Sequence, residues 1–392
     1  MKIPTHFVFL DRGGHGAFLV LRLVDLLRPD RAPLDEQAFA YQRTAVERFV
    51  TEGEPTEDGD WLGLVLEAVK EALADPLRDA LVETLGGYAI NRRDAERYDE
   101  AVDVLETARG LDPREGMLAT PLGECLLLAG RTEELLELAG AWVLDESVYV
   151  RRAGRYFEGE VLLARGDAWG AEGHFRALIE ADEGVVDDSP AVQVRGALAR
   201  ALLAQGRAAE AAVEAWRAHG MWEREGLGEL GLALEALGEL EGAANAWGVE
   251  ALGHPQPAGR WDAVAAEVRI TARLGDRVSF ERWVRTGRSF HESGLPGRGH
   301  EAGFWVEAAW GFASFGERKR AEEALAVARE VAGEAVGTEA RFRVREAQAR
   351  MKPGVVRDFP PPARLPPELA GAVGEAIAGV ARYAPAAQWR PT

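Results

Sequence analysis

The chain has 392 residues, of which 47% are hydrophobic and 28% charged, a composition typical of soluble globular proteins. With 46 Lys and Arg against 65 Asp and Glu, its formal charge is −19, which disfavours nucleic acid as a partner. No apolar run approaches the ~20 residues that cross a bilayer, and Met1–Leu10 develops no signal-peptide core, so we expect neither a membrane nor a secreted protein.

The length exceeds that of a typical single core and predicts either two to three domains or one elongated array. Cys125 is the only cysteine, which excludes an internal disulfide and fits a reducing, cytoplasmic compartment. Arginine far outnumbers lysine, which suggests a GC-rich, bacterial genome.

Residues 1–80 are predicted to form a helical cap. Amphipathic patterns indicate helices over Ala17–Leu27, Asp35–Val50 and Trp61–Leu73, with Asp60 as the N-cap of the third. The glycine-rich turn Asp11–Gly16 could cradle an anion at a helix start, but it lacks the lysine and hydroxyl of a phosphate-binding loop. A plain capping turn is the favoured interpretation.

Residues 81–335 are predicted to be an array of helix pairs, because apolar residues recur at three- and four-residue spacing with glycines between segments. Six glycines are each followed five residues later by a small or apolar residue: Gly130 and Leu135, Gly166 and Ala171, Gly206 and Ala211, Gly238 and Ala243, Gly275 and Phe280, Gly316 and Ala321. These glycines are 36, 40, 32, 37 and 41 residues apart. A tight turn between antiparallel helices favours glycine, and close helix axes favour a small residue.

This spacing resembles the ~34-residue period of tetratricopeptide repeats. The family motif is met most fully by Trp305, Phe312, Gly316, Ala321, Leu325 and Ala328. Other partial copies include Leu230, Gly231, Gly238, Ala243, Trp247 and Pro255, and, near the start, Tyr98, Ala101, Leu105, Ala108 and Pro113. The resemblance implies an all-α, right-handed solenoid of about seven degenerate repeats with atypical helical caps at both ends. An irregular helical bundle is the alternative.

Residues 336–392 are predicted to be helices with a proline-rich connector. Glu339–Met351 and Glu368–Tyr383 have helical patterns, whereas the prolines within Lys352–Pro367 prevent a helix there. The pattern fits either a docked tether or a free linker.

No set of residues specifies a reaction, so we predict a protein that is not an enzyme and needs no cofactor or metal. His291 and His300, beside Glu292 and Glu301, are the strongest metal candidate, but no third ligand is fixed by the sequence, and a solvated loop is favoured. Cys125 lies in an apolar helical pattern and is expected to be a buried thiol.

In a tetratricopeptide stack the first helix of each repeat lines the concave groove, so the resemblance implies a peptide or partner protein bound there. Projected onto this chain, the candidate binding residues are Tyr156, Glu160, Arg200, Glu235, Arg269, Arg273 and Trp310. Trp305 and Trp310 lie ~140° apart on a helix, so one should pack and the other should line a surface. The predicted function is a protein-interaction scaffold. The alternatives are a bacterial ligand- or peptide-sensing regulator and a metal-dependent enzyme.

Overall fold

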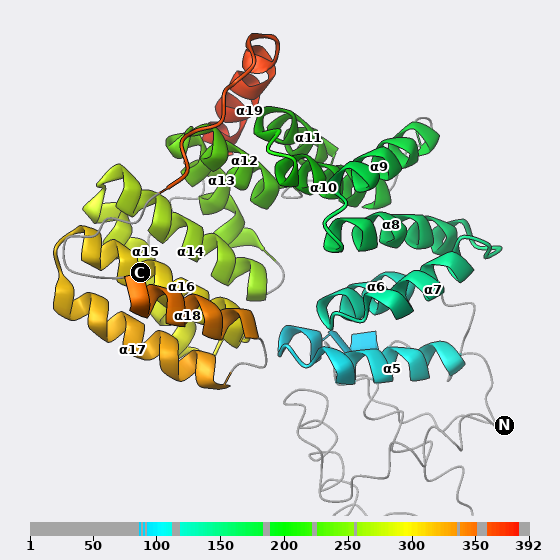
Figure 1. Ribbon diagram of the computed structural model, residues 1–392, viewed down its shortest axis with the longest axis horizontal. Helices are drawn as coiled ribbons and strands as arrows, with labels where there is room; N and C mark the ends of the chain where they lie inside the picture. The colour runs from blue at the N-terminus through cyan, green and yellow to red at the C-terminus, as the bar shows by residue number, and fades with distance from the viewer. Residues whose placement is uncertain are drawn as a thin grey trace, which may run out of the picture. The chain divides into compact units, whose positions relative to one another are not determined.

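The described part of the chain is built from helices alone. The computed structural model describes residues 86–87, 89–90, 92–111, 118–182, 189–221, 226–254, 257–334, 338–350 and 359–383. From Tyr98 onward the described residues form fifteen α-helices and one short 3-10 helix, residues 86–87, 89–90 and 92–94 are also helical, and none of the described residues is in a strand (Figure 1). The all-α prediction is therefore confirmed for them, whereas the predicted cap of residues 1–80 lies outside them.

Most of the helices form pairs joined by a short turn. We call the members of each pair the first and the second helix. The first helices are α6 (Ala119–Leu128), α8 (Val148–Ala164), α10 (Ser189–Ala204), α12 (Leu227–Leu237), α14 (Pro257–Leu274) and α16 (Arg298–Ser314). The second helices are α7 (Thr132–Trp142), α9 (Ala168–Asp182), α11 (Ala208–Met221), α13 (Leu240–Gly253), α15 (Arg277–Glu292) and α17 (Arg318–Glu334). The remaining helices are α5 (Tyr98–Leu111), α18 (Thr338–Arg350), the 3-10 helix η2 (Pro367–Leu369) and α19 (Ala370–Tyr383).

Each pair turns through the glycine that the sequence predicts. All six glycines have φ between 70° and 82°, in the left-handed region. At Gly206, for example, the glycine N–H donates to Leu203 O and the next N–H, of Arg207, donates to Leu202 O, both at 2.9 Å. This is the Schellman arrangement, which satisfies the last carbonyls of the first helix. The residues five positions after the glycines are all buried, as predicted.

A seventh turn of the same kind has no glycine. Glu96 has φ 60°, its N–H donates to Arg93 O, and the N–H of Arg97 donates to Arg92 O. Ala101, five residues later, is fully buried. The turn lies 34 residues before Gly130, so the periodic geometry extends one step further than the glycines indicate.

Close packing within some pairs depends on a glycine facing an aromatic ring. A Cβ on Gly159 of α8 would lie 2.4 Å from the Phe175 ring, and one on Gly231 of α12 would lie 2.5 Å from Trp247 Nε1. Both glycines lie seven residues before the turn glycine, and both rings nine residues after it. The missing side chain therefore makes room for the ring.

The chain divides into two compact units, Met1–Ala153 and Gly154–Thr392, with the boundary inside α8. This division reflects compactness, and the predicted limits of the repeat array at residues 80 and 335 stay predictions. Within the described residues, no helix combines the length and the apolar character needed to span a membrane.

The C-terminal proline-rich segment is docked over residues 359–369. Its backbone is non-helical up to Pro366, as predicted. The Ala363 N–H donates to Ala236 O at the end of α12, at 2.7 Å, and the Arg273 guanidinium lies 4.2 Å from the Phe359 ring centroid. The segment thus contacts two successive first helices near their C-terminal ends.

Helix α19 follows this segment and packs on α11 and α13 (Figure 1). It buries Val373, Ala376 and Val380. A Cβ on Gly379 would lie 2.2 Å from the Trp216 ring of α11, so a glycine is required for this approach. Helix α19 therefore covers second helices rather than first helices.

Candidate partner-binding surface

Arg200 on α10 connects three successive first helices. Its Nη2 donates to Glu160 Oε1 of α8 at 2.6 Å and lies 3.5 Å from the Tyr156 hydroxyl. Its Nη1 donates to Glu229 Oε1 of α12 at 3.0 Å. The Arg200 side chain remains 38% exposed, whereas Glu160 is buried. Three of the predicted binding residues thus form one cluster that reaches solvent through Arg200.

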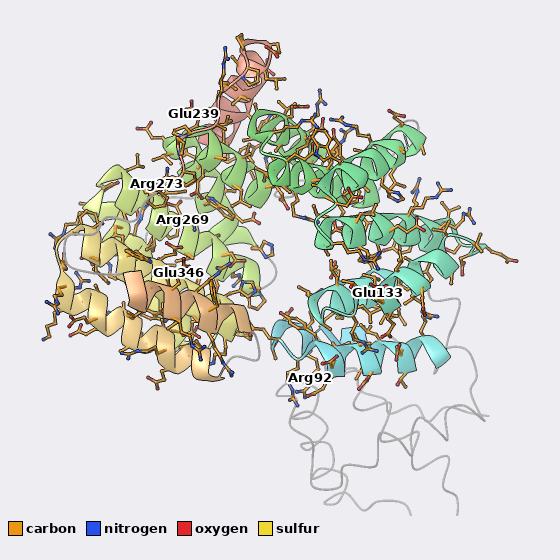
Figure 2. All side chains as sticks on the ribbon, in the orientation of Figure 1. Arg92, Glu133, Glu239, Arg269, Arg273 and Glu346 are labelled. Carbon is orange, nitrogen blue, oxygen red and sulfur yellow. The ribbon has the colours of Figure 1, made fainter. Side chains whose placement is uncertain are left out.

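Glu235 on α12 is the centre of a second cluster. Arg269 of α14 donates to both of its carboxylate oxygens, at 3.0 Å from Nε and 2.6 Å from Nη2. Arg273 Nη1 lies 3.6 Å from Glu235 Oε2, and Trp247 Nε1 donates to Oε1 at 3.2 Å. Figure 2 labels Arg269 and Arg273 on α14. Two-point contact fixes the orientation of a guanidinium as well as its position.

The two clusters form a charged row across α8, α10, α12, α14 and α16. Arg269 completes it, because its Nη1 lies 3.7 Å from Glu307 Oε1 on α16. Trp310, also on α16, is half-buried and packs against the hydrophobic core, while Trp305 is buried. Trp305 therefore packs, as predicted for one of the two, whereas Trp310 also contacts the core and its lining of a surface stays a prediction. The structure brings six of the seven candidate residues into the row, and their role in binding stays a prediction.

Leu232 is an apolar surface residue that the sequence reasoning missed. It lies on α12 three residues after Glu229 and three before Glu235, and its side chain is 44% exposed. Three-residue spacing places side chains on neighbouring positions of one helix face. An exposed leucine thus sits between the two charged clusters. Its three-residue spacing from the candidate residue Glu235 was the feature of the sequence that could have identified it.

Burial and pairing act in opposite directions on the arginines of the row. Burial lowers the pKa of Arg269, but the hydrogen bonds and charge of Glu235 more than offset this and raise it. The same balance raises the pKa of Arg200, where Glu160 supplies the largest opposing charge. Both guanidinium groups are therefore permanently charged.

The carboxyl group of Glu267 on α14, unlike those of Glu160 and Glu235, has a raised pKa. It is 3% exposed, and burial raises its pKa to about 8, with a smaller contribution from the charge of Glu235 and an opposing one from Arg282. A carboxyl group with this pKa is mostly protonated at neutral pH. Glu267 therefore adds little negative charge beside the Glu235 cluster.

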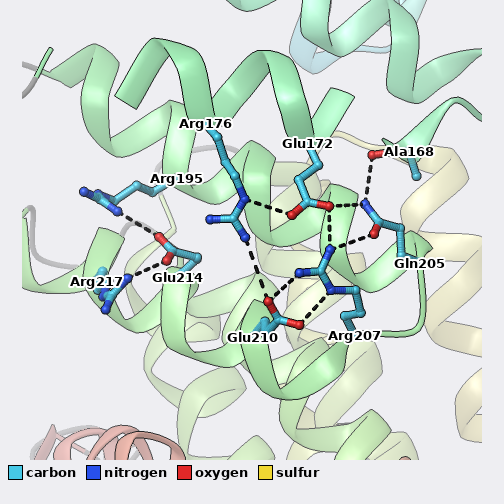
Figure 3. A network of polar contacts seen from close by, with 9 residues as sticks. All are labelled: Ala168, Glu172, Arg176, Arg195, Gln205, Arg207, Glu210, Glu214 and Arg217. Carbon is cyan, nitrogen blue, oxygen red and sulfur yellow. Dashed lines mark hydrogen bonds and ion pairs between the residues drawn. The ribbon is translucent and has the colours of Figure 1, made fainter. Parts of the chain in front are cut away.

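Ion pairs also join the second helices, so pairing alone does not mark a binding surface. In the network of Figure 3, Arg176 Nη2 of α9 lies 3.9 Å from Glu210 Oε2 of α11, and Arg207, just before α11, pairs with Glu172 Oε2 of α9 at 2.5 Å. Burial raises the pKa of Glu172, but hydrogen bonds from Gln205 and Arg176, together with the charge and hydrogen bond of Arg207, lower it below its usual value. The row on the first helices is distinguished by its extent, because it runs across five first helices with the exposed Leu232 between its two clusters.

The histidines singled out by sequence lie against separate carboxylates. His291 Nδ1 contacts the buried Glu301, and His300 Nδ1 lies 2.8 Å from Asp262 Oδ1. No group of three potential metal ligands converges among the described residues. Cys125 is 1% exposed, as predicted, and burial raises its pKa to about 12, so its thiol is inert as a nucleophile.

Comparison with known proteins finds no match for this chain, either among protein-family models or among curated proteins.

Proposed function

We propose that this protein is a cytoplasmic, non-enzymatic scaffold that binds a peptide segment or partner protein on its first helices. The repeated turns, 32 to 41 residues apart, support a right-handed, tetratricopeptide-like solenoid of about seven repeats. In such a stack the first helices line the concave face. The proposed partner is not nucleic acid, which the charge of −19 disfavours.

The observation that carries the proposal is Leu232 between the two charged clusters. An exposed apolar group flanked by oriented guanidinium and carboxylate groups offers both an anchor and polar specificity. The clusters are already paired within the chain, so a partner gains from contact with their outward edges rather than from neutralising a lone charge.

The test is capture of partners from native lysate with wild type, Leu232→Glu and Leu274→Glu. Leu274 is the matched control, because it is also a leucine 44% exposed in a first helix, α14, but lies at the turn end. We expect Leu232→Glu to lose partners that Leu274→Glu retains. Equal sets from the two variants would contradict binding at this surface.

A ligand- or peptide-sensing regulator is the second candidate. It is favoured by Arg273, which contacts both Glu235 in the row and Phe359 in the docked C-terminal segment. A ligand that attracts Arg273 would weaken the hold on that segment. Faster tryptic cleavage at Arg364 when the captured partner is added would support this role, and an unchanged rate would count against it.

A further inference from the structure

A small cavity opens among α15, α16 and α17, away from the charged row. Its volume is about 330 Å³. The buried side chains of Trp305, Phe312 and Ala324 line it, together with polar groups that include Arg288 and His291 of α15. Its size and its mixture of aromatic and charged lining suit one bulky side chain of a binding partner.

The cavity occupies the position that α19 fills two pairs earlier. There, Ile377 of α19 and Leu234 of α12 both lie beside Gly242, because a Cβ on Gly242 would be 3.2 Å from Ile377 and 3.3 Å from Leu234. Gly242 lies four residues after its turn glycine and Leu234 four residues before it; Arg320 and Phe312 hold the same positions around Gly316. The seat of α19 shows that the gap between two second helices accepts a separate segment.

The cavity among α15, α16 and α17 differs in charge from the site that α19 occupies. Arg320 stands at the position that Gly242 occupies two pairs earlier, and its guanidinium lies 4.0 Å from the Phe312 ring centroid. Glu281 and Glu317 pair with Arg320, so its charge is already balanced. An apolar helix such as α19 therefore cannot enter as it does beside Gly242.

Helix α15 carries three exposed arginines that have no close ion-pair partner among the described residues. Arg282, Arg285 and Arg288 are exposed, and none forms an ion pair or side-chain hydrogen bond with another residue in the described part of the chain. Two acids line the cavity: Glu323, which pairs with Lys319 at 3.8 Å, and Glu292. A basic helix face on a chain of charge −19 favours an acidic partner.

We propose that α15, α16 and α17 form a second binding site, for an acidic peptide segment that places one bulky apolar side chain in the cavity. Asp and Glu side chains of the partner pair with Arg285 and Arg288, and the apolar anchor lies against Trp305 and Phe312. The site is separate from the charged row and does not depend on it.

The experiment measures binding of a fluorescein-labelled peptide, a central Trp-Leu pair flanked by glutamates, by fluorescence anisotropy. We expect saturable binding to the full chain that weakens at least about tenfold in Arg285→Glu, Arg288→Glu. The matched control, Arg155→Glu, Arg329→Glu, changes the same charge at two other exposed arginines and should bind as wild type does. Added salt should weaken binding to wild type.

A second variant separates the cavity from the charges. Ala324→Leu fills the cavity while keeping every arginine. It should therefore weaken peptide binding as much as replacing the Trp-Leu pair of the peptide by alanines does. Equal binding by the arginine variant, equal binding of a peptide with lysines in place of glutamates, or no saturation up to about 1 mM would overturn the proposal. Leu232→Glu should bind this peptide normally, so failure here is distinguishable from failure of the first-helix surface.

Discussion

The turn glycines can be tested most cleanly at Gly206. Its φ is 76°, and a Cβ added there would have no atom within 4 Å, so Gly206→Ala introduces conformational strain without a clash. The left-handed conformation costs an L-residue roughly 1–2 kcal/mol. The lower entropy of alanine in the unfolded chain offsets about 0.4–1 kcal/mol of this. We expect Gly206→Ala to lower the free energy of unfolding by about 1 kcal/mol.

The matched control is Gly173→Ala, inside α9. Gly173 also has no atom within 4 Å of an added Cβ, but its backbone is helical and its φ is negative. The same chemical change should there raise the free energy of unfolding by up to about 1 kcal/mol, because alanine is the better helix former. The two variants therefore differ by about 2 kcal/mol with opposite signs.

Urea unfolding followed by circular dichroism at the helix band measures both variants. Both glycines lie in the second compact unit, so they report on the same folded unit. If Gly206→Ala proved neutral or stabilising, or if both variants shifted the midpoint the same way, the assignment of Gly206 to a left-handed turn would be refuted.

Three further predictions concern packing and charge. Gly231→Ala should lower the free energy of unfolding by about 1–3 kcal/mol in urea, because its Cβ meets Trp247, and Trp247→Leu in that background should recover part of the loss. Gly379→Leu should expel α19 and expose Trp216, detected as stronger acrylamide quenching of tryptophan fluorescence; unchanged quenching would contradict the packing. Glu267, with its pKa raised to about 8, favours folding when protonated, so its contribution falls as pH rises from about 4.5 to 8. Glu267→Gln should remove that fall, and identical pH profiles of stability for the variant and wild type would refute it.

The sequence was sufficient for features that depend on local backbone geometry. Glycine is the residue that adopts positive φ at no steric cost, so Gly206 and its counterparts could be located from spacing alone. Glu96 escaped the same reasoning because it occupies the turn position without being glycine. A side chain there is strained, and only the neighbouring hydrogen bonds reveal the turn.

Features that depend on contacts between distant segments could be predicted only in part. The first-helix projection placed Arg200 and Glu235 on one surface, but it could not show that both are paired within the chain. Leucine is usually a core residue, and Leu232 is exposed because another face of α12 packs against the core. The docking of α19 depends on the complementarity of Gly379 and Trp216, which are 163 positions apart in the sequence.

The measurement that tests the central claim most directly is hydrogen–deuterium exchange of the protein with and without its captured partner. If the partner binds the first helices, amide exchange should slow in α10, α12 and α14, around Arg200, Leu232 and Arg269. Slowing confined to the second helices α9, α11 and α13, with the first helices unchanged, would contradict the account.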